Sequence, residues 1–243
     1  MLFLSPTKEL STKTVENEVA GRVPCCIINE DKVGKGHVTA ELVRHFKAPS
    51  GVVANLVFAT HAIMPFLPFI ANKRSVHVIV DEVMQVVQYA SHRLPVTHPL
   101  ITDGIQLDPY NAIYSRVVPQ KSLTAKGRNK ENDECLGVIA PTIRRLTNRY
   151  WHNYVNTEQY ERLRNGQSQT LAFHSILAPD IFAGFASVFM TAANFEATML
   201  YQLWGDWNGA EDAPFASQPS FFRDDDFINS LRFHAHHVTS PSL

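Results

Sequence analysis

The sequence has few cysteines, no long apolar run and almost no net charge. Its three cysteines, Cys25, Cys26 and Cys135, form neither an even set for disulfides nor a metal-binding spacing. This favours a reducing compartment, so we expect a cytoplasmic protein. No window approaches the roughly eighteen apolar residues of a membrane span, so we expect no membrane partner. The formal net charge of -1 predicts no global attraction to nucleic acid, although a local basic patch is compatible with it.

Alternation of apolar strand-like runs with helix-like runs dominates the first ninety residues. MLFLS, VPCCIIN, NLVFAT and VHVIVD read as strands, and a helix-like segment follows each, the last being EVMQVVQYA. This pattern is typical of βαβ units and predicts an α/β fold with a parallel sheet flanked by helices. Farther along the chain, TLAFHSIL and SVFMTA read as two more buried strands, and TEQYERLRNG and FEATMLYQLW as helices.

The middle of the chain, residues 91–133, breaks this regularity. It carries scattered prolines, little periodicity and the basic stretch KSLTAKGRNKEND. We therefore expect a loop-rich insertion or flexible loop there, within one domain that spans residues 1–243. Residues 205–243 are expected to form a C-terminal extension.

The run Val76–Val83 ends a buried strand on two adjacent acids, Asp81 and Glu82. Two unit charges a few ångströms apart repel by roughly 3 kcal/mol at an effective dielectric constant of about 20. A raised pKa on one carboxyl group or a bound cation with a polyanion relieves such repulsion. The simpler alternative is a strand that emerges into solvent with both carboxylates hydrated.

Four short segments follow the ends of expected strands. They are Ser5-Pro6-Thr7-Lys8, Thr60-His61, Asp81-Glu82 and Thr191-Ala192-Ala193. In an open parallel sheet the carboxyl ends of the strands form the edge where ligands bind. Ser5 fits a helix N-cap with Pro6 at the first helical position, and such a helix start can hold a phosphate oxygen or can simply be capped.

In this order, the segments resemble the first RecA-like domain of superfamily-two helicases, the group of the DEAD and DEAH proteins. SPTKEL resembles motif Ia, FATH motif Ib, VIVDEV motif II and FMTAANFEAT motif III. The resemblance covers roughly residues 1–204. It implies a RecA-like sheet and hydrolysis of ATP with Mg²⁺, coupled to binding of DNA or RNA.

The resemblance also implies roles for individual residues. Asp81 would hold Mg²⁺ on the nucleotide, Glu82 would act as general base, and Gln85 would couple nucleotide state to strand binding. Ser5, Pro6, Thr7, Lys8, Thr60 and His61 would contact the nucleic-acid backbone. Thr191 and Ala192 match the first two residues of motif III, whereas Ala193 and Asn194 depart from its pattern, so the coupling role is the weakest part of the likeness.

The Walker A loop of the family, GxxxxGK[ST], has no counterpart in the sequence. The nearest segment, residues 33–37 (VGKGH), lacks the leading glycine and the hydroxyl residue after lysine. That loop cradles the β- and γ-phosphates. The second RecA-like domain is also missing. We therefore expect a sheet that is incomplete at its N-terminal edge, a partner chain or further segments that supply the missing parts, and negligible ATPase activity from this chain alone.

Two other function classes remain open from the residues. One is a non-catalytic nucleic-acid-binding or interaction protein that retains the fold. The other is a metal-dependent hydrolase that uses Asp81 and Glu82, or the tail histidines His234, His236 and His237 near Asp224–Asp226. A solvated edge strand also explains the histidine tail.

Overall fold

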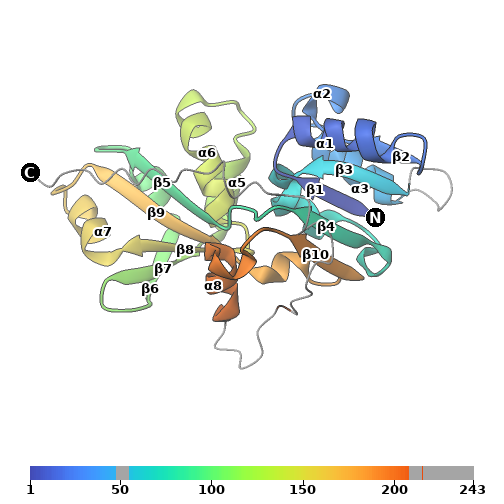
Figure 1. Ribbon diagram of the computed structural model, residues 1–243. Helices are drawn as coiled ribbons and strands as arrows, with labels where there is room; N and C mark the ends of the chain where they lie inside the picture. The colour runs from blue at the N-terminus through green and yellow to red at the C-terminus, as the bar shows by residue number, and fades with distance from the viewer. Residues whose placement is uncertain (48–54, 208–214, 216–243) are drawn as a thin grey trace, which may run out of the picture.

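Two five-stranded sheets organise the described part of the chain. The computed structural model describes residues 1–47, 55–207 and 215 (Figure 1). One sheet is parallel and contains the first four strands of the chain and the last, and the other is antiparallel and contains the five strands between them. The expectation of an α/β fold with a parallel sheet flanked by helices is confirmed.

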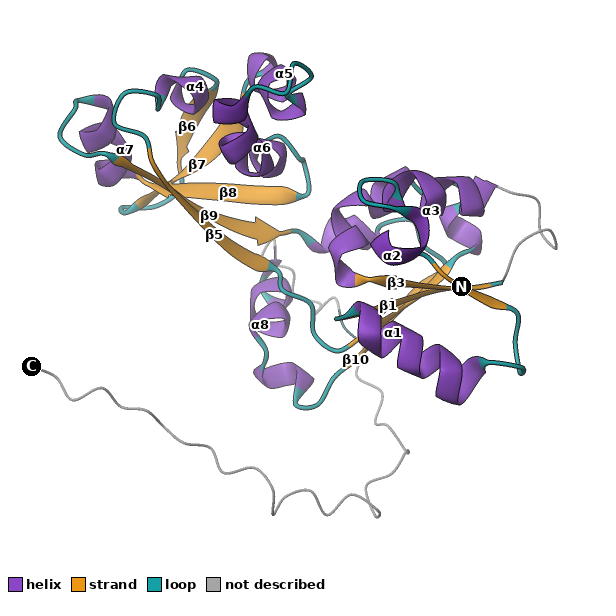
Figure 2. Ribbon diagram, turned by 90° about the horizontal axis from the view of Figure 1, so that it is seen from above, coloured by secondary structure: helices purple, strands orange, loops and turns teal. Residues whose placement is uncertain are grey.

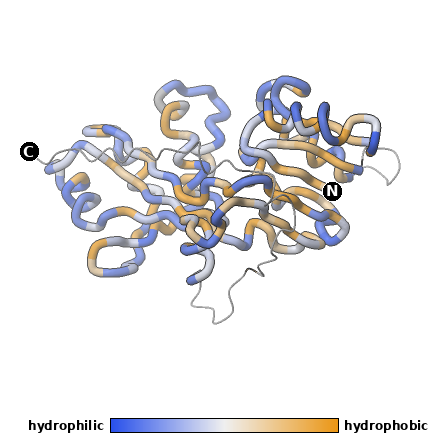
Figure 3. The backbone as a smooth tube through the Cα atoms, viewed as in Figure 1, coloured by the Kyte–Doolittle hydropathy of each residue, from blue (hydrophilic) through white to orange (hydrophobic). Residues whose placement is uncertain are grey.

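The parallel sheet has the strand order β10-β4-β1-β3-β2. Its strands are β1 (Leu2–Ser5), β2 (Cys25–Ile27), β3 (Leu56–Thr60), β4 (His77–Asp81) and β10 (Ser187–Thr191). The central strands are buried on both faces, which is why they read as near-continuous apolar runs. Figure 3 shows this concentration of hydrophobic residues in the strands and hydrophilic stretches in the helices around them.

Helices cover both faces of the parallel sheet. The helix α1 lies on one face, and α3 with the 3-10 helix η2 lies on the other (Figure 2). The helical elements of this part are α1 (Lys8–Thr14), the π-helix η1 (Val15–Val19), α2 (Glu30–Val33), α3 (Val38–Lys47), η2 (His61–Phe69), η3 (Lys73–Ser75), η4 (Pro179–Phe182), η5 (Phe195–Ala197) and α8 (Met199–Gly205). Pro65 and Pro68 hold η2 in the tighter helix, because proline removes the donors that an α-helix needs.

The antiparallel sheet has the strand order β5-β9-β8-β7-β6. Its strands are β5 (Val87–Arg93), β6 (Ile105–Pro109), β7 (Tyr114–Pro119), β8 (Trp151–Asn156) and β9 (Thr170–Leu177), and its helices are α4 (Pro99–Thr102), α5 (Lys121–Arg128), α6 (Glu134–Leu146) and α7 (Thr157–Arg164). Helices α5 and α6 pack on one face, and their apolar side chains join Leu171 and Phe173 of β9 in one core. A second core lies under the parallel sheet and extends to Trp151 and Leu177 at the near end of the antiparallel sheet.

Two expectations need correction here. Residues 91–133 are not a flexible loop, because they contain part of β5 and the elements α4, β6, β7 and α5. The segment EVMQVVQYA is not a helix: Val87–Arg93 pairs with β9 over its full length. The expectation that TLAFHSIL forms a strand is confirmed, and this strand belongs to the antiparallel sheet. The inserted segment is thus a folded unit.

In the described part of the chain, no helix is long and apolar enough to cross a membrane. Most of the expected C-terminal extension at residues 205–243, including the tail histidines and Asp224–Asp226, lies outside the described residues.

Candidate functional site at the rim of the parallel sheet

The four segments singled out in the sequence lie at one rim of the parallel sheet. Ser5 pairs with Thr60 in register, and Asp81 pairs with Thr191. Leu4 pairs with Val80, which brings the end of β1 level with the end of β4. Because all five strands run in the same direction, their carboxyl ends meet along this rim. Segments up to 110 residues apart in the chain are therefore neighbours here.

Asp81 and Thr191 are in direct contact. The Thr191 hydroxyl lies 3.2 Å from Asp81 Oδ1 and donates a hydrogen bond to it, and the main-chain N–H of Glu82 donates to the Thr191 carbonyl at 2.8 Å. The carboxylate of Asp81 is thus oriented by the neighbouring strand. Its remaining oxygen lone pairs are available to a cation, and the Glu82 side chain is exposed beside it.

Glu82 has a left-handed backbone with a φ of 63°. This conformation turns the chain sharply out of β4 and directs the following residues toward the second sheet. A residue with a Cβ is strained there by about 1–2 kcal/mol relative to an ordinary backbone conformation. Such strain is found most often where a side chain must be held at a functional rim.

A pair of substitutions separates the strain at Glu82 from its charge. Glu82→Gly and Glu82→Ala both remove the carboxylate, but only glycine adopts the left-handed conformation without cost. After allowance for the greater freedom of glycine in the unfolded chain, we expect the glycine variant to be more stable by about 0.5–1 kcal/mol. Denaturant unfolding of both variants measures the difference, and equal stabilities would contradict the assignment of strain.

His61 connects three strands of the sheet. Its Nε2 lies 2.9 Å from the main-chain oxygen of Asp81, and it also bonds to the main chain of Leu4. Burial lowers the pKa of His61, and these hydrogen bonds and the charges of Asp81 and Glu82 oppose this effect. A neutral imidazole with its proton on Nε2 donates to the Asp81 oxygen. The ring of His61 therefore helps to fix the position of Asp81.

The lowered pKa of His61 predicts a loss of stability in acid. The unfolded chain binds a proton near pH 6.5, whereas the folded protein holds His61 neutral to lower pH. The stabilisation is complete above about pH 6.5 and is lost as the pH falls below it. His61→Gln keeps an N–H donor and does not titrate, so unfolding measured between about pH 7 and pH 5 should depend less on pH in this variant.

A second histidine, His92, provides a comparison in the same measurement of unfolding against pH. Burial also lowers the pKa of His92, which bonds to the Thr142 hydroxyl at 2.8 Å. His92→Gln should remove a further part of the pH dependence, and the double variant should show both reductions. A His61→Gln variant that keeps the full wild-type slope would contradict the prediction.

The expected N-cap at Ser5 is wrong. Helix α1 begins at Lys8, and its N-cap is Thr7, whose hydroxyl accepts from the Leu10 N–H at 3.1 Å. Ser5 is the last residue of β1, and its buried hydroxyl bonds to Ser11 and to the Thr7 carbonyl. Pro6 connects Ser5, the last residue of β1, to Thr7, the N-cap of α1. The Ser5 hydroxyl is therefore occupied inside the protein, and only the residues after it reach the surface.

Lys8 is held at the rim by an ion pair with Asp31. The two charged groups lie 2.7 Å apart, and this contact raises the pKa of the Lys8 ammonium group. Asp31 belongs to α2, which follows β2 at the edge of the sheet. Sequence reasoning missed Asp31, because acids in the first turn of a helix are common and carry no signal of a binding site. Both side chains are exposed, so an anion can compete for Lys8.

The remaining predicted residues differ in how close they lie to Asp81. Ala192 directly follows Thr191, whereas Gln85 is exposed on the segment that leads to β5. The VGKGH segment connects α2 and α3 beside β2, and β3 and β1 separate β2 from β4. That loop is therefore not adjacent to Asp81. Within the described ranges, no group of three or more His, Cys, Asp or Glu side chains is arranged to hold a metal ion.

No family model, curated protein or solved structure matches this chain. The site is therefore interpreted from its own geometry.

Proposed function

We propose that the rim of the parallel sheet is the ligand-binding edge of a RecA-like, helicase-type module that couples ATP and Mg²⁺ to a DNA or RNA strand. The observation that carries this proposal is the convergence of four segments on one rim, with Asp81 held by Thr191. In this proposal Asp81 binds the nucleotide-bound Mg²⁺ and Glu82 activates water. Thr7, Lys8 and Thr60 bind the strand backbone.

The chain needs a further element for hydrolysis. ATP hydrolysis in this class depends on backbone N–H groups and a lysine that hold the phosphates, and the sequence has no GxxxxGK[ST] segment. Asp81 alone is a weak site for Mg²⁺, which is usually held by one or two carboxylates together with phosphate oxygens. This favours, as the second candidate, a nucleic-acid-binding protein that keeps the fold without catalysis.

Phosphate release measured with malachite green, at saturating single-stranded DNA or RNA, separates the two candidates. We expect no release above background from this chain alone. Turnover that disappears in Glu82→Gln would contradict the need for a further element and would favour a complete ATPase.

Binding of a single strand tests the rim itself. Lys8→Ala should weaken binding and lower the salt dependence of the association constant by about 0.7 in slope, which is the loss of one phosphate contact. Lys13→Ala is the matched control, because Lys13 forms an equally short ion pair with Glu9 in the last turn of the same helix, away from the rim. If the two variants bind alike, the rim does not hold the strand.

A further inference from the structure

The antiparallel sheet has one covered face and one open face. Alternate residues of β9 show this most clearly: Leu171 and Phe173 point into the core under α5 and α6, whereas Ala172 and His174 lie on the opposite face. Figure 2 shows α4, α5 and α6 on one side of these strands. At the end nearest to the parallel sheet, the open face is covered, because the ring of Trp207 lies 4.6 Å from that of His152.

Aromatic side chains line the uncovered part of the open face in register. Tyr89, His174 and Tyr154 are direct cross-strand neighbours on β5, β9 and β8. Their row continues to Arg116 on β7, which pairs with Tyr154. Tyr89 is 63% exposed although its ring lies only 5.1 Å from that of His174. A large aromatic ring left this open on a regular sheet has a free face for another ring.

Two more tyrosines extend the aromatic surface. The ring of Tyr114 meets the edge of His174 at 5.6 Å, and the ring of Tyr110 lies 4.9 Å from Tyr154. Tyr110 is as exposed as Tyr89. The aromatic surface therefore crosses four strands, from β5 to β7 and the turn that precedes it.

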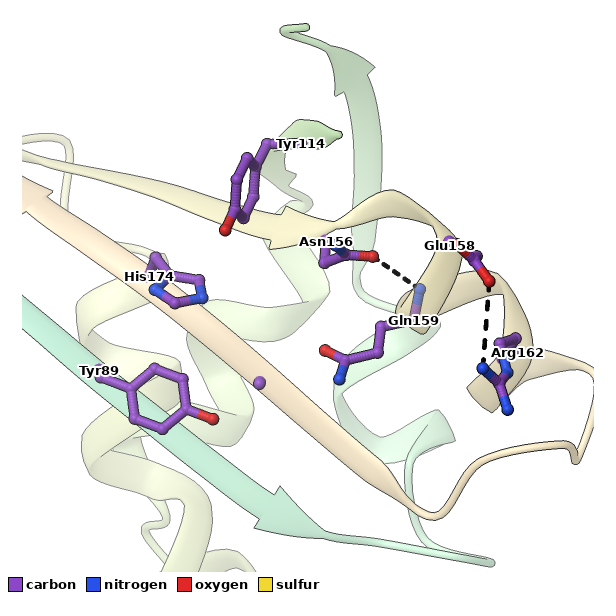
Figure 4. A pocket seen from close by; sticks show the side chains of 8 residues that line it. Tyr89, Tyr114, Asn156, Glu158, Gln159, Arg162 and His174 are labelled. Atoms are coloured by element: carbon purple, nitrogen blue, oxygen red, sulfur yellow. Dashed lines mark hydrogen bonds and ion pairs between the residues drawn. The ribbon is translucent and has the colours of Figure 1, made fainter. Parts of the chain in front are cut away.

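A hollow of about 580 Å³ lies between these rings and helix α7. Figure 4 shows Tyr89, Tyr114 and His174 on one side of it and Gln159 and Arg162 on the other. Ala172 is the one aliphatic side chain in its lining. A surface that anchors a protein partner usually offers an apolar pocket at its centre, whereas this hollow offers ring faces, amides and a guanidinium group.

The charges of the open face are mixed, with a small excess of arginine. Arg93, Arg116 and Arg162 lie on or beside it, together with Asp108 and Glu158. Glu158 lies 4.0 Å from Arg162, and Asp108 is the cross-strand neighbour of Arg116. Binding to this face must therefore depend on stacking more than on neutralised phosphates, because few arginines are free of an acidic neighbour.

We propose that the open face of the antiparallel sheet binds single-stranded nucleic acid, with bases stacked on Tyr89, Tyr114 and His174 and phosphates held by Arg116 and Arg162. Unpaired bases have the exposed planar faces that these rings can accept, whereas a duplex hides them. The site is on a different sheet from the rim and does not require nucleotide hydrolysis. It therefore goes beyond the proposed function, and variants of the two sites test the two proposals separately.

Fluorescence anisotropy with a labelled oligothymidylate of about 12 nucleotides tests the proposal. Tyr89→Ala combined with Tyr114→Ala should weaken binding by about 5- to 100-fold, which corresponds to the loss of one stacked base. Tyr89→Phe combined with Tyr114→Phe keeps both rings and should bind like the wild type. The salt slope of wild-type binding to this face should be no steeper than about -2, since at most three arginines take part.

Controls separate the open face from folding and from the rim. Phe189→Ala removes an exposed ring from β10 of the parallel sheet and should leave binding unchanged, and circular dichroism checks that every variant folds. Unchanged affinity in the double alanine variant would overturn the proposal, as would a wild-type chain that binds no single strand. If Lys8→Ala abolishes binding while the double alanine variant does not affect it, the rim alone binds the strand. A double alanine variant that changes only the oligomeric state would assign the face to a second copy of the chain.

Discussion

Replacement of Trp204 with alanine is expected to lower the free energy of unfolding by about 3–5 kcal/mol. Trp204 is 1% exposed in α8, and its ring packs against Phe182. Its indole N–H donates to the Leu177 carbonyl at 2.7 Å, at the end of β9. The substitution would leave a large cavity and a buried carbonyl without its donor, where the two sheets share one core. Since small domains are stable by about 5–15 kcal/mol, this loss is a large fraction of the total free energy of unfolding.

Two further variants make this prediction specific. Trp204→Phe keeps most of the buried ring and loses the hydrogen bond, so it should cost roughly 1–3 kcal/mol. Met199→Ala lies in the same helix but changes a side chain that is 61% exposed, and it should change the stability by less than about 0.5 kcal/mol. Guanidinium unfolding followed by fluorescence and circular dichroism measures all three. A loss below about 1 kcal/mol in Trp204→Ala would show that α8 is not part of the core.

Phe173→Ala is expected to have an effect of similar size on the antiparallel sheet, again about 3–5 kcal/mol. Phe173 has no exposed surface and lies on β9 against the apolar side chains of α5 and α6. The next residue, His174, points to the opposite face of the sheet. Tyr89 on β5 is the cross-strand neighbour of His174 on β9. The fold should therefore depend strongly on one face of this sheet and weakly on the other.

The matched control for Phe173→Ala is Tyr89→Ala. Both remove an aromatic ring from adjacent strands, but Tyr89 is on the open face and has few packing partners to lose, so its cost should be within about 1 kcal/mol. Urea unfolding of the two variants measures the contrast. Equal losses would mean that the open face is part of the core, and this would also remove the basis for a binding surface there.

The parallel sheet was predictable because its strands are short apolar runs and its central strands are buried on both faces. The runs around Val57, Val78 and Val188 are apolar without interruption, and the polar residues that follow them mark where each strand ends. The rim follows from strand direction alone. The N-cap was placed two residues too early, because Ser5 and Thr7 are both good caps, and burial of Ser5 in β1 decides between them.

The antiparallel sheet was not predictable in the same way. Val83, Val86 and Val87 have the i, i+3, i+4 spacing of a helix, whereas the partner that makes β5 a strand is β9, far along the chain. The prolines of the middle segment were read as signs of a loop. Instead Pro99 begins α4, Pro109 ends β6 and Pro119 ends β7. The row of rings on the open face is visible only once strands from four parts of the chain are in register.

The pairing of β5 with β9 has a consequence for the order of folding. Thr191 and Asp81 are 110 residues apart in sequence, and β10 cannot reach β4 until the intervening chain brings them together. Val87 and Ile176 are paired, so once the inserted sheet has formed, the remaining loop that must close is short. We expect the inserted sheet to form early and the rim to assemble in a late kinetic step, as is usual for contacts of large sequence separation.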